Sequence, residues 1–141
     1  MGRFIFLTAV AVWLGTVVSF SYVLLPTIHR AAEGQASQLL RRLFPRYYST
    51  GIVCGLIALA AVSLAPTTPT LPPPERVRLA FPVVVALICT LAAQQLLLPR
   101  LAALQGKSEE ARYARLHQFS AMLNSTVLAM LVLAVAAIAT R

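Results

Sequence analysis

The sequence is short of charge, above all of negative charge: Asp and Glu together number 4 of its 141 residues, against 12 Lys and Arg. Charged residues make up 11% of the chain and hydrophobic residues 59%, whereas soluble domains have about 25% and roughly 45–50%. A soluble domain of this length could not cover so much apolar surface. The composition therefore excludes an ordinary soluble fold and favours a lipid bilayer as the solvent.

The positive charge has its own interpretation in this setting. A formal net charge of +8 would suggest nucleic acid as the partner of a soluble protein. Here the basic residues lie between the apolar runs, at the level of lipid headgroups. We therefore expect them to orient the protein and to contact anionic lipids, with no role in nucleic-acid binding.

Motifs for catalysis or metal binding are also missing. The sequence has no Cys-x-x-Cys, no His-x-x-x-His and no paired acids within an apolar stretch, so we predict that the protein is not an enzyme. Its two cysteines, Cys54 and Cys89, lie inside apolar runs and are typical of packing residues. We expect no cofactor of its own. Three alternatives stay open: haem between His29 and His117, copper held by Cys54 and Met122, and a chlorophyll magnesium on His117.

Four apolar stretches are long enough to cross a bilayer, which takes about 20 residues. They cover residues 4–25, 47–65, 79–98 and 119–140. Short connections favour antiparallel neighbours, so we predict an all-α membrane protein, an up-down-up-down bundle of four transmembrane helices forming one domain over residues 1–141. The first stretch exceeds the roughly 7–15 apolar residues of a signal peptide, and we expect it to be retained.

The connections have distinct characters. Residues 28–44 show the apolar spacing of an amphipathic helix, which either lies at the interface or extends the neighbouring spans. The proline-rich segment 66–76 should be extended. A last helix starting at Ser108 could run unbroken to Thr140 and project from the membrane. The first and third spans both end in Leu-Leu-Pro, at 24–26 and 97–99, which suggests a duplicated two-helix unit.

The distribution of basic residues predicts the orientation. The connections after the first and third spans hold Arg30, Arg41, Arg42, Arg46, Arg100, Lys107, Arg112 and Arg115. The opposite side holds Arg3, Arg76, Arg78 and Arg141. The excess places the first set in the cytoplasm and both termini on the non-cytoplasmic side.

Polar residues at membrane depth form the candidate site. His117, Ser120 and Asn124 are spaced i, i+3, i+7 and share one helix face, which should point into the bundle. The residues expected at the same level on the second and third spans are Arg46, Tyr47, Tyr48, Gln94, Gln95 and Arg100. Interhelical hydrogen bonding explains such a layer, and a ligand, ion or proton path is the alternative.

Two pairs of small residues indicate close helix packing. Gly15 and Ser19 on the first span, and Gly51 and Gly55 on the second, are each four residues apart. This spacing lets two helix backbones approach closely. The sequence does not say whether the neighbouring helix belongs to the same chain.

Several of these motifs together resemble a known family. They are Trp13-Leu14-Gly15, Pro26, Phe44-Pro45-Arg46-Tyr47-Tyr48, Pro99-Arg100, and Leu116-His117 with Ser120 and Asn124. In order and spacing the chain resembles the bacterial family called domain of unknown function 4149, which is related to the eukaryotic transmembrane protein 205. The resemblance covers nearly the whole chain and implies a four-span membrane fold, here in the bacterial inner membrane. His29 departs from the pattern, which has an aromatic residue after the proline.

Three functions remain at this stage. The first is a non-enzymatic accessory subunit of a larger membrane complex, respiratory or photosynthetic, whose partners are the lipid bilayer and other membrane subunits. The second is a small transporter or carrier for a metal or another solute. It lacks an intramembrane Asp, Glu or Lys for ion coupling. The third, a membrane enzyme or cofactor protein, lacks a nucleophile–base pair.

Overall fold

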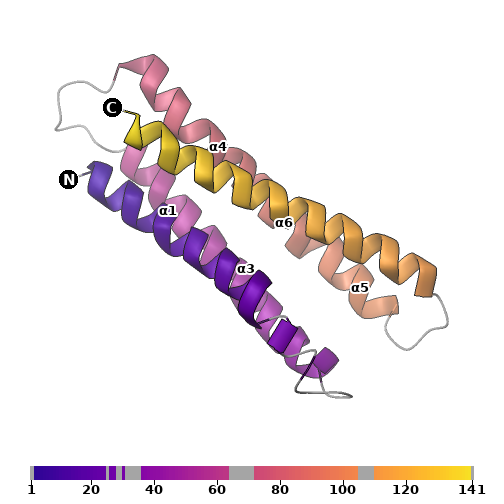
Figure 1. The fold of residues 1–141 in the computed structure, drawn as a ribbon. Coiled ribbons are helices and arrows are strands. Elements are labelled where there is room, and N and C mark those ends of the chain that lie inside the picture. Colours follow the sequence, from indigo (N-terminus) through magenta and orange to yellow (C-terminus); the bar gives the residue numbers. More distant parts are fainter. Residues whose placement is uncertain are drawn as a thin grey trace.

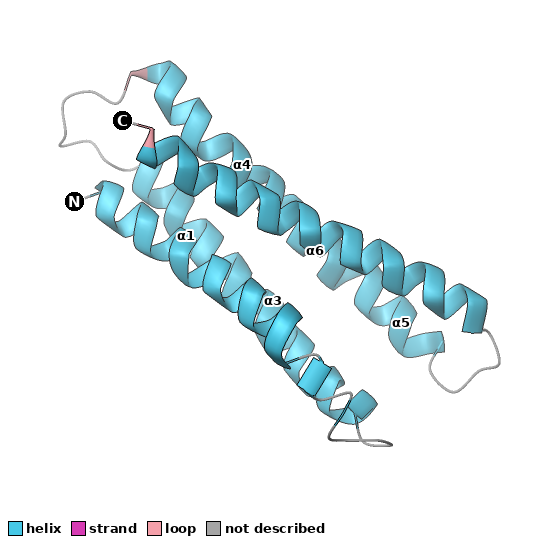
Figure 2. Ribbon diagram, in the orientation of Figure 1, coloured by secondary structure: helices cyan, strands magenta, loops and turns pink. Residues whose placement is uncertain are grey.

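The protein is all-helical in the part that its structure, a computed structural model, describes. The described residues are 2–24, 26–27, 30, 36–63, 72–104 and 110–140. They contain helices and no strand (Figure 2). The stretches long and apolar enough to cross a membrane are Gly2–Leu24, Arg42–Ser63, Pro74–Arg100 and Arg115–Ala139. The predicted fold class is confirmed, and the helices have the character of a multi-pass membrane protein.

The four spans form two antiparallel hairpins. The elements in chain order are α1 (Gly2–Val18) with its continuation η1 (Ser19–Leu24), α3 (Ala36–Ser63), α4 (Pro73–Ala92) with η2 (Ala93–Leu97) and α5 (Leu98–Leu104), and α6 (Glu110–Ala139). α1 packs on α3 and α4 packs on α6, while α3 with α4 and α1 with α6 join the hairpins. The direction alternates from span to span, and both ends of the chain lie at the same end of the bundle (Figure 1).

A π-helical segment interrupts the regular α-helix near the end of the first and third spans. η1 lies just before Pro26 and η2 just before Pro99. A proline has no N–H for the carbonyl four residues earlier and its ring collides with that carbonyl. The affected carbonyls belong to Tyr22 and Gln95, inside the two π segments. Local widening of the helix relieves this conflict. The widened segment occurs at the matching place in both hairpins, which agrees with a duplicated two-helix unit.

The core is packed around the only tryptophan. Trp13 is 2% exposed and lies against Gly51 and Gly55 of α3. A Cβ atom added at Gly51 would be 2.6 Å from Trp13 Nε1, and one at Gly55 would be 2.6 Å from Leu87 Cδ2. The α3 glycines therefore serve contacts within the chain. Gly15 differs, because a Cβ there would meet nothing within 4 Å and Gly15 is exposed.

The helices extend beyond the spans predicted from hydropathy. α3 starts at Ala36 and continues through Pro45, so the later part of the amphipathic segment 28–44 extends the second span. α6 covers 30 residues up to Ala139, close to the predicted long helix, while Ser108 lies outside the described residues. Most of the proline-rich segment 66–76 also lies outside them.

At the end of the bundle that holds the termini, an arginine side chain links α4 to α6 by a hydrogen bond. Arg78, near the start of α4, donates a hydrogen bond of 2.7 Å from its guanidinium to the carbonyl of Ala137. That carbonyl belongs to the last turn of α6, where helix carbonyls have no intrahelical partner. The contact therefore joins the second hairpin at this end and places a cation at the negative end of the α6 dipole.

Candidate functional site

The polar side chains of three helices meet at one point in the other half of the bundle. The Tyr47 hydroxyl of α3 donates a hydrogen bond of 2.7 Å to Asn124 Oδ1 of α6. Asn124 Nδ2 in turn donates one of 2.6 Å to Ser21 Oγ of η1. Asn124 thus links the hydroxyl groups of Tyr47 and Ser21 through the two ends of its amide. We call these three residues the polar clamp.

Aromatic rings surround the polar clamp. The ring of Phe20 stacks on that of Tyr47 with centroids 4.3 Å apart, and it meets Phe44 at 5.3 Å. Tyr48 meets Tyr47 edge-on at 5.0 Å and lies parallel to Phe44 at 6.0 Å. Phe20 and Tyr48 are buried. The cluster therefore fixes the orientation of the Tyr47 ring before any hydrogen bond is made.

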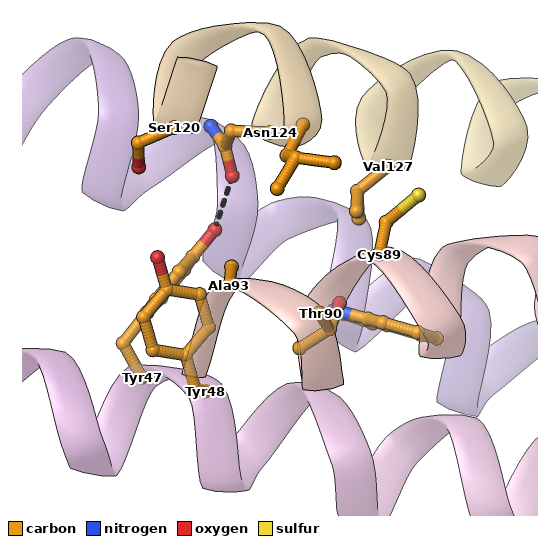
Figure 3. Close-up of a pocket in the computed structure, with 10 residues that line it drawn as sticks. Tyr47, Tyr48, Cys89, Thr90, Ala93, Ser120, Asn124 and Val127 are labelled. Atoms are coloured by element: carbon orange, nitrogen blue, oxygen red, sulfur yellow. Dashed lines mark hydrogen bonds between the residues drawn. The ribbon is translucent and has the colours of Figure 1, made fainter. Parts of the chain in front are cut away.

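A small cavity lies beside the polar clamp. Its volume is about 10 Å³, roughly the space that one water molecule needs. The side chains that line it come from four helices and include Trp13, Tyr48, Thr90, Ser120 and Asn124. Figure 3 shows the hydroxyl groups of Tyr47 and Tyr48 directed towards α6, where Asn124 and Ser120 lie. Thr90 is satisfied by its own helix, through a 2.8 Å hydrogen bond to the Ala86 carbonyl.

The predicted site residues divide into two groups. Tyr47, Tyr48, Ser120 and Asn124 line this cavity. The residues Arg46, Gln95, Arg100 and His117 are exposed, and Gln94 is half-buried without lining the cavity. The polar stripe of α6 thus enters the bundle at Ser120 and Asn124, while its first member, His117, lies on the outside.

Ser21 is the member of the polar clamp that the sequence does not reveal. It lies within an apolar run two residues after Ser19, and an α-helical wheel gives no reason to prefer one serine over the other. The π segment changes the angular register of the helix at this point. Pro26, five residues later, is the signal that could have indicated the change.

The described residues offer little to a metal ion. They include no group of three or more His, Cys, Asp or Glu side chains placed to hold one. Cys54 is buried in the core and Met122 is 68% exposed on α6, so the pair suggested for copper is not gathered in one buried site. The side chain of His117 is exposed, and His29, the other histidine of the haem alternative, lies outside the described residues.

Comparison with known proteins gives one result. A family model described as domain of unknown function (DUF4149) matches residues 8–110. The match includes Trp13, the Phe44–Tyr48 motif and Pro99, and it stops where α6 begins, so Ser120 and Asn124 lie beyond it. No curated protein and no solved structure shows significant similarity to the chain. Because the matched residues make up more than half of its length, the chain belongs to the DUF4149 family.

Proposed function

We propose that the protein is a non-enzymatic integral membrane subunit that packs into a larger membrane complex, respiratory or photosynthetic. The observation that carries the proposal is the closed interior at the polar clamp. The polar groups there satisfy one another, and the cavity beside them has room for about one water molecule. Small-molecule sites have volumes of about 300–1,000 Å³, so this cavity is too small for a substrate, which favours the outer surface as the functional one.

The outer surface supports the same proposal. Large apolar side chains face outward along every span, for example Val12 and Val53 in the first hairpin and Phe81 and Leu133 in the second. In a bilayer these faces contact either lipid tails or the helices of another protein. A bundle so thin that much of each helix faces outward is well suited to lie at the edge of an assembly.

Copurification tests this proposal. The chain is tagged at its native expression level and extracted from its own membranes in a mild detergent, and the eluate is analysed by mass spectrometry and absorption spectroscopy. A four-span protein of similar abundance from the same membranes serves as the control bait. We expect defined larger subunits in fixed stoichiometry with the chain and absent from the control. A chain that elutes alone, or only with copies of itself, would refute the proposed role.

A small transporter or carrier for a metal or another solute is the second candidate. The observation that favours it is the pair of π segments, η1 and η2, because π segments before prolines are common at functional bends. Both π segments lie in the half of the bundle that holds the polar clamp, since η1 contains Ser21 and η2 packs against Tyr48. The test is solute flux into proteoliposomes that contain only the purified chain. Flux that is lost when Pro26 and Pro99 are replaced by alanine, which makes the helices more regular, would favour this candidate over the first.

A further inference from the structure

A long groove runs along the outside of the first hairpin, between α1 and α3. Its volume is about 650 Å³, within the range of ligand sites. The walls are formed by Val12, Gly15 and Val23 on one side, and by Leu43, Arg46 and Thr50 on the other. Gly15 leaves the middle of the groove open, since a Cβ there would meet nothing within 4 Å.

The groove is apolar along its length. The two threonines in its walls use their hydroxyl groups within their own helices: Thr16 donates to the Val12 carbonyl at 2.8 Å and Thr50 to the Arg46 carbonyl at 2.9 Å. Ser19 adds one more hydroxyl group, and apart from Arg46 and the Tyr47 hydroxyl the remaining walls are aliphatic and aromatic carbon. An occupant must therefore be a hydrocarbon over most of its length.

The positive charge is confined to one end. Tyr47 stacks on Phe20, so its neighbour Arg46 lies at the level of η1, near the end of the span. Arg46 is exposed, and Arg42, also exposed, precedes it by one helical turn on the same face. Guanidinium groups at this level match the geometry of a phosphate and bind it through paired N–H groups.

The length of the groove matches one leaflet of a bilayer. From Val12 to Phe20, the level of Arg46, the lining covers about 12 Å of helix, and half of a hydrocarbon core is about 15 Å thick. The groove is shallow and open to the side, so an occupant lies against the two helices.

We propose that this groove is a binding site for one anionic phospholipid of the bilayer, with its phosphate on Arg46 and an acyl chain lying over Gly15. The positive charge of Arg46 and the apolar walls of the rest of the groove together fit an amphiphile with a negatively charged headgroup. The site belongs to the isolated chain and does not depend on the proposed role in a larger complex.

Native mass spectrometry of the delipidated full chain tests the proposal, with phosphatidylglycerol and phosphatidylcholine of identical acyl chains as probes. Both lipids carry a phosphate, but only phosphatidylcholine brings a choline ammonium close to Arg42 and Arg46. One phosphatidylglycerol should therefore bind about tenfold more tightly than phosphatidylcholine. Arg46→Gln should remove this preference, whereas Arg100→Gln, which changes an exposed arginine outside the groove, should keep it.

Filling the groove tests the acyl-chain part. Gly15→Leu should abolish retention of both lipids, and Val12→Phe, at a half-exposed wall position, provides a second blocking variant. Ala129→Leu on the exposed face of α6 is the matched control. Equal affinity for the two lipids, undiminished binding after both blocking substitutions, or a homodimer that Gly15→Leu dissociates would each overturn the proposal; the last would make the groove a protein interface.

Discussion

Trp13 lies directly over Gly51, so closely that a single added methyl group would come within 2.6 Å of the indole Nε1. The two residues join α1 to α3 near the middle of the bundle. Trp13 also lines the small cavity beside the polar clamp. Packing of the first hairpin and the shape of the polar site are therefore set by the same side chain.

Gly51→Ala should destabilise the bundle. Trp13 is 2% exposed and the cavity beside it measures only about 10 Å³, which leaves the indole little room to withdraw. Overpacking a filled core costs about 1–3 kcal/mol. Unfolding of the purified protein in mixed detergent micelles measures the change. Gly15→Ala is the control, because its new methyl group meets nothing within 4 Å. Equal stability of the two variants would show that the Trp13 contact is not restrictive.

The orientation predicted from basic residues can be tested at the two ends of α6. In a Cys54→Ala, Cys89→Ala background, single cysteines are placed at Ala111 and Thr140, which are both exposed. A membrane-impermeant maleimide added to intact cells should label position 140, and should label position 111 only after permeabilisation, because cytoplasmic loops carry the excess of Arg and Lys. The reverse pattern would invert the topology.

The purified chain, freed of partners, should be colourless and should contain no stoichiometric metal. Cys54 is buried in the core while Met122 is on the outer face, and a compact copper site needs its soft ligands in one layer. Absorption spectroscopy and elemental analysis provide the measurement. A Soret band removed by His117→Ala, or copper lost on Cys54→Ser, would establish a cofactor and remove the basis for a purely structural role.

The sequence predicts much of this fold because lipid imposes simple rules. Uncharged runs of about 20 residues must span the membrane as helices, and the order of four such runs leaves few arrangements. The same rules place Asn124 and Tyr47 in the interior, since lipid offers them no hydrogen bonds. Both predictions depend on local composition alone.

Other features depend on geometry that local composition does not encode. Ser21 joins the polar clamp because a π segment alters the helix register, and His117 lies outside although its spacing matches that of Ser120 and Asn124. Gly15 and Ser19 have the spacing of a helix-packing pair, yet both line an open groove. Spacing identifies a face of a helix, but the neighbouring helices decide whether that face is covered.

The central claim is that the polar clamp holds the bundle together and performs no chemistry, and a double-mutant cycle on Tyr47 and Asn124 tests it most directly. Asn124→Leu should lower the free energy of unfolding by about 1 kcal/mol, and the coupling with Tyr47→Phe should be about 0.6–1.7 kcal/mol, the range of interhelical hydrogen bonds in membranes. The readout is unfolding in mixed micelles, with copurification from native membranes measured in parallel. We expect each single variant to be less stable, and each variant that still folds to copurify with the same complex. Unchanged stability in both single variants, together with loss of a bound ligand, pigment or transport activity, would contradict it.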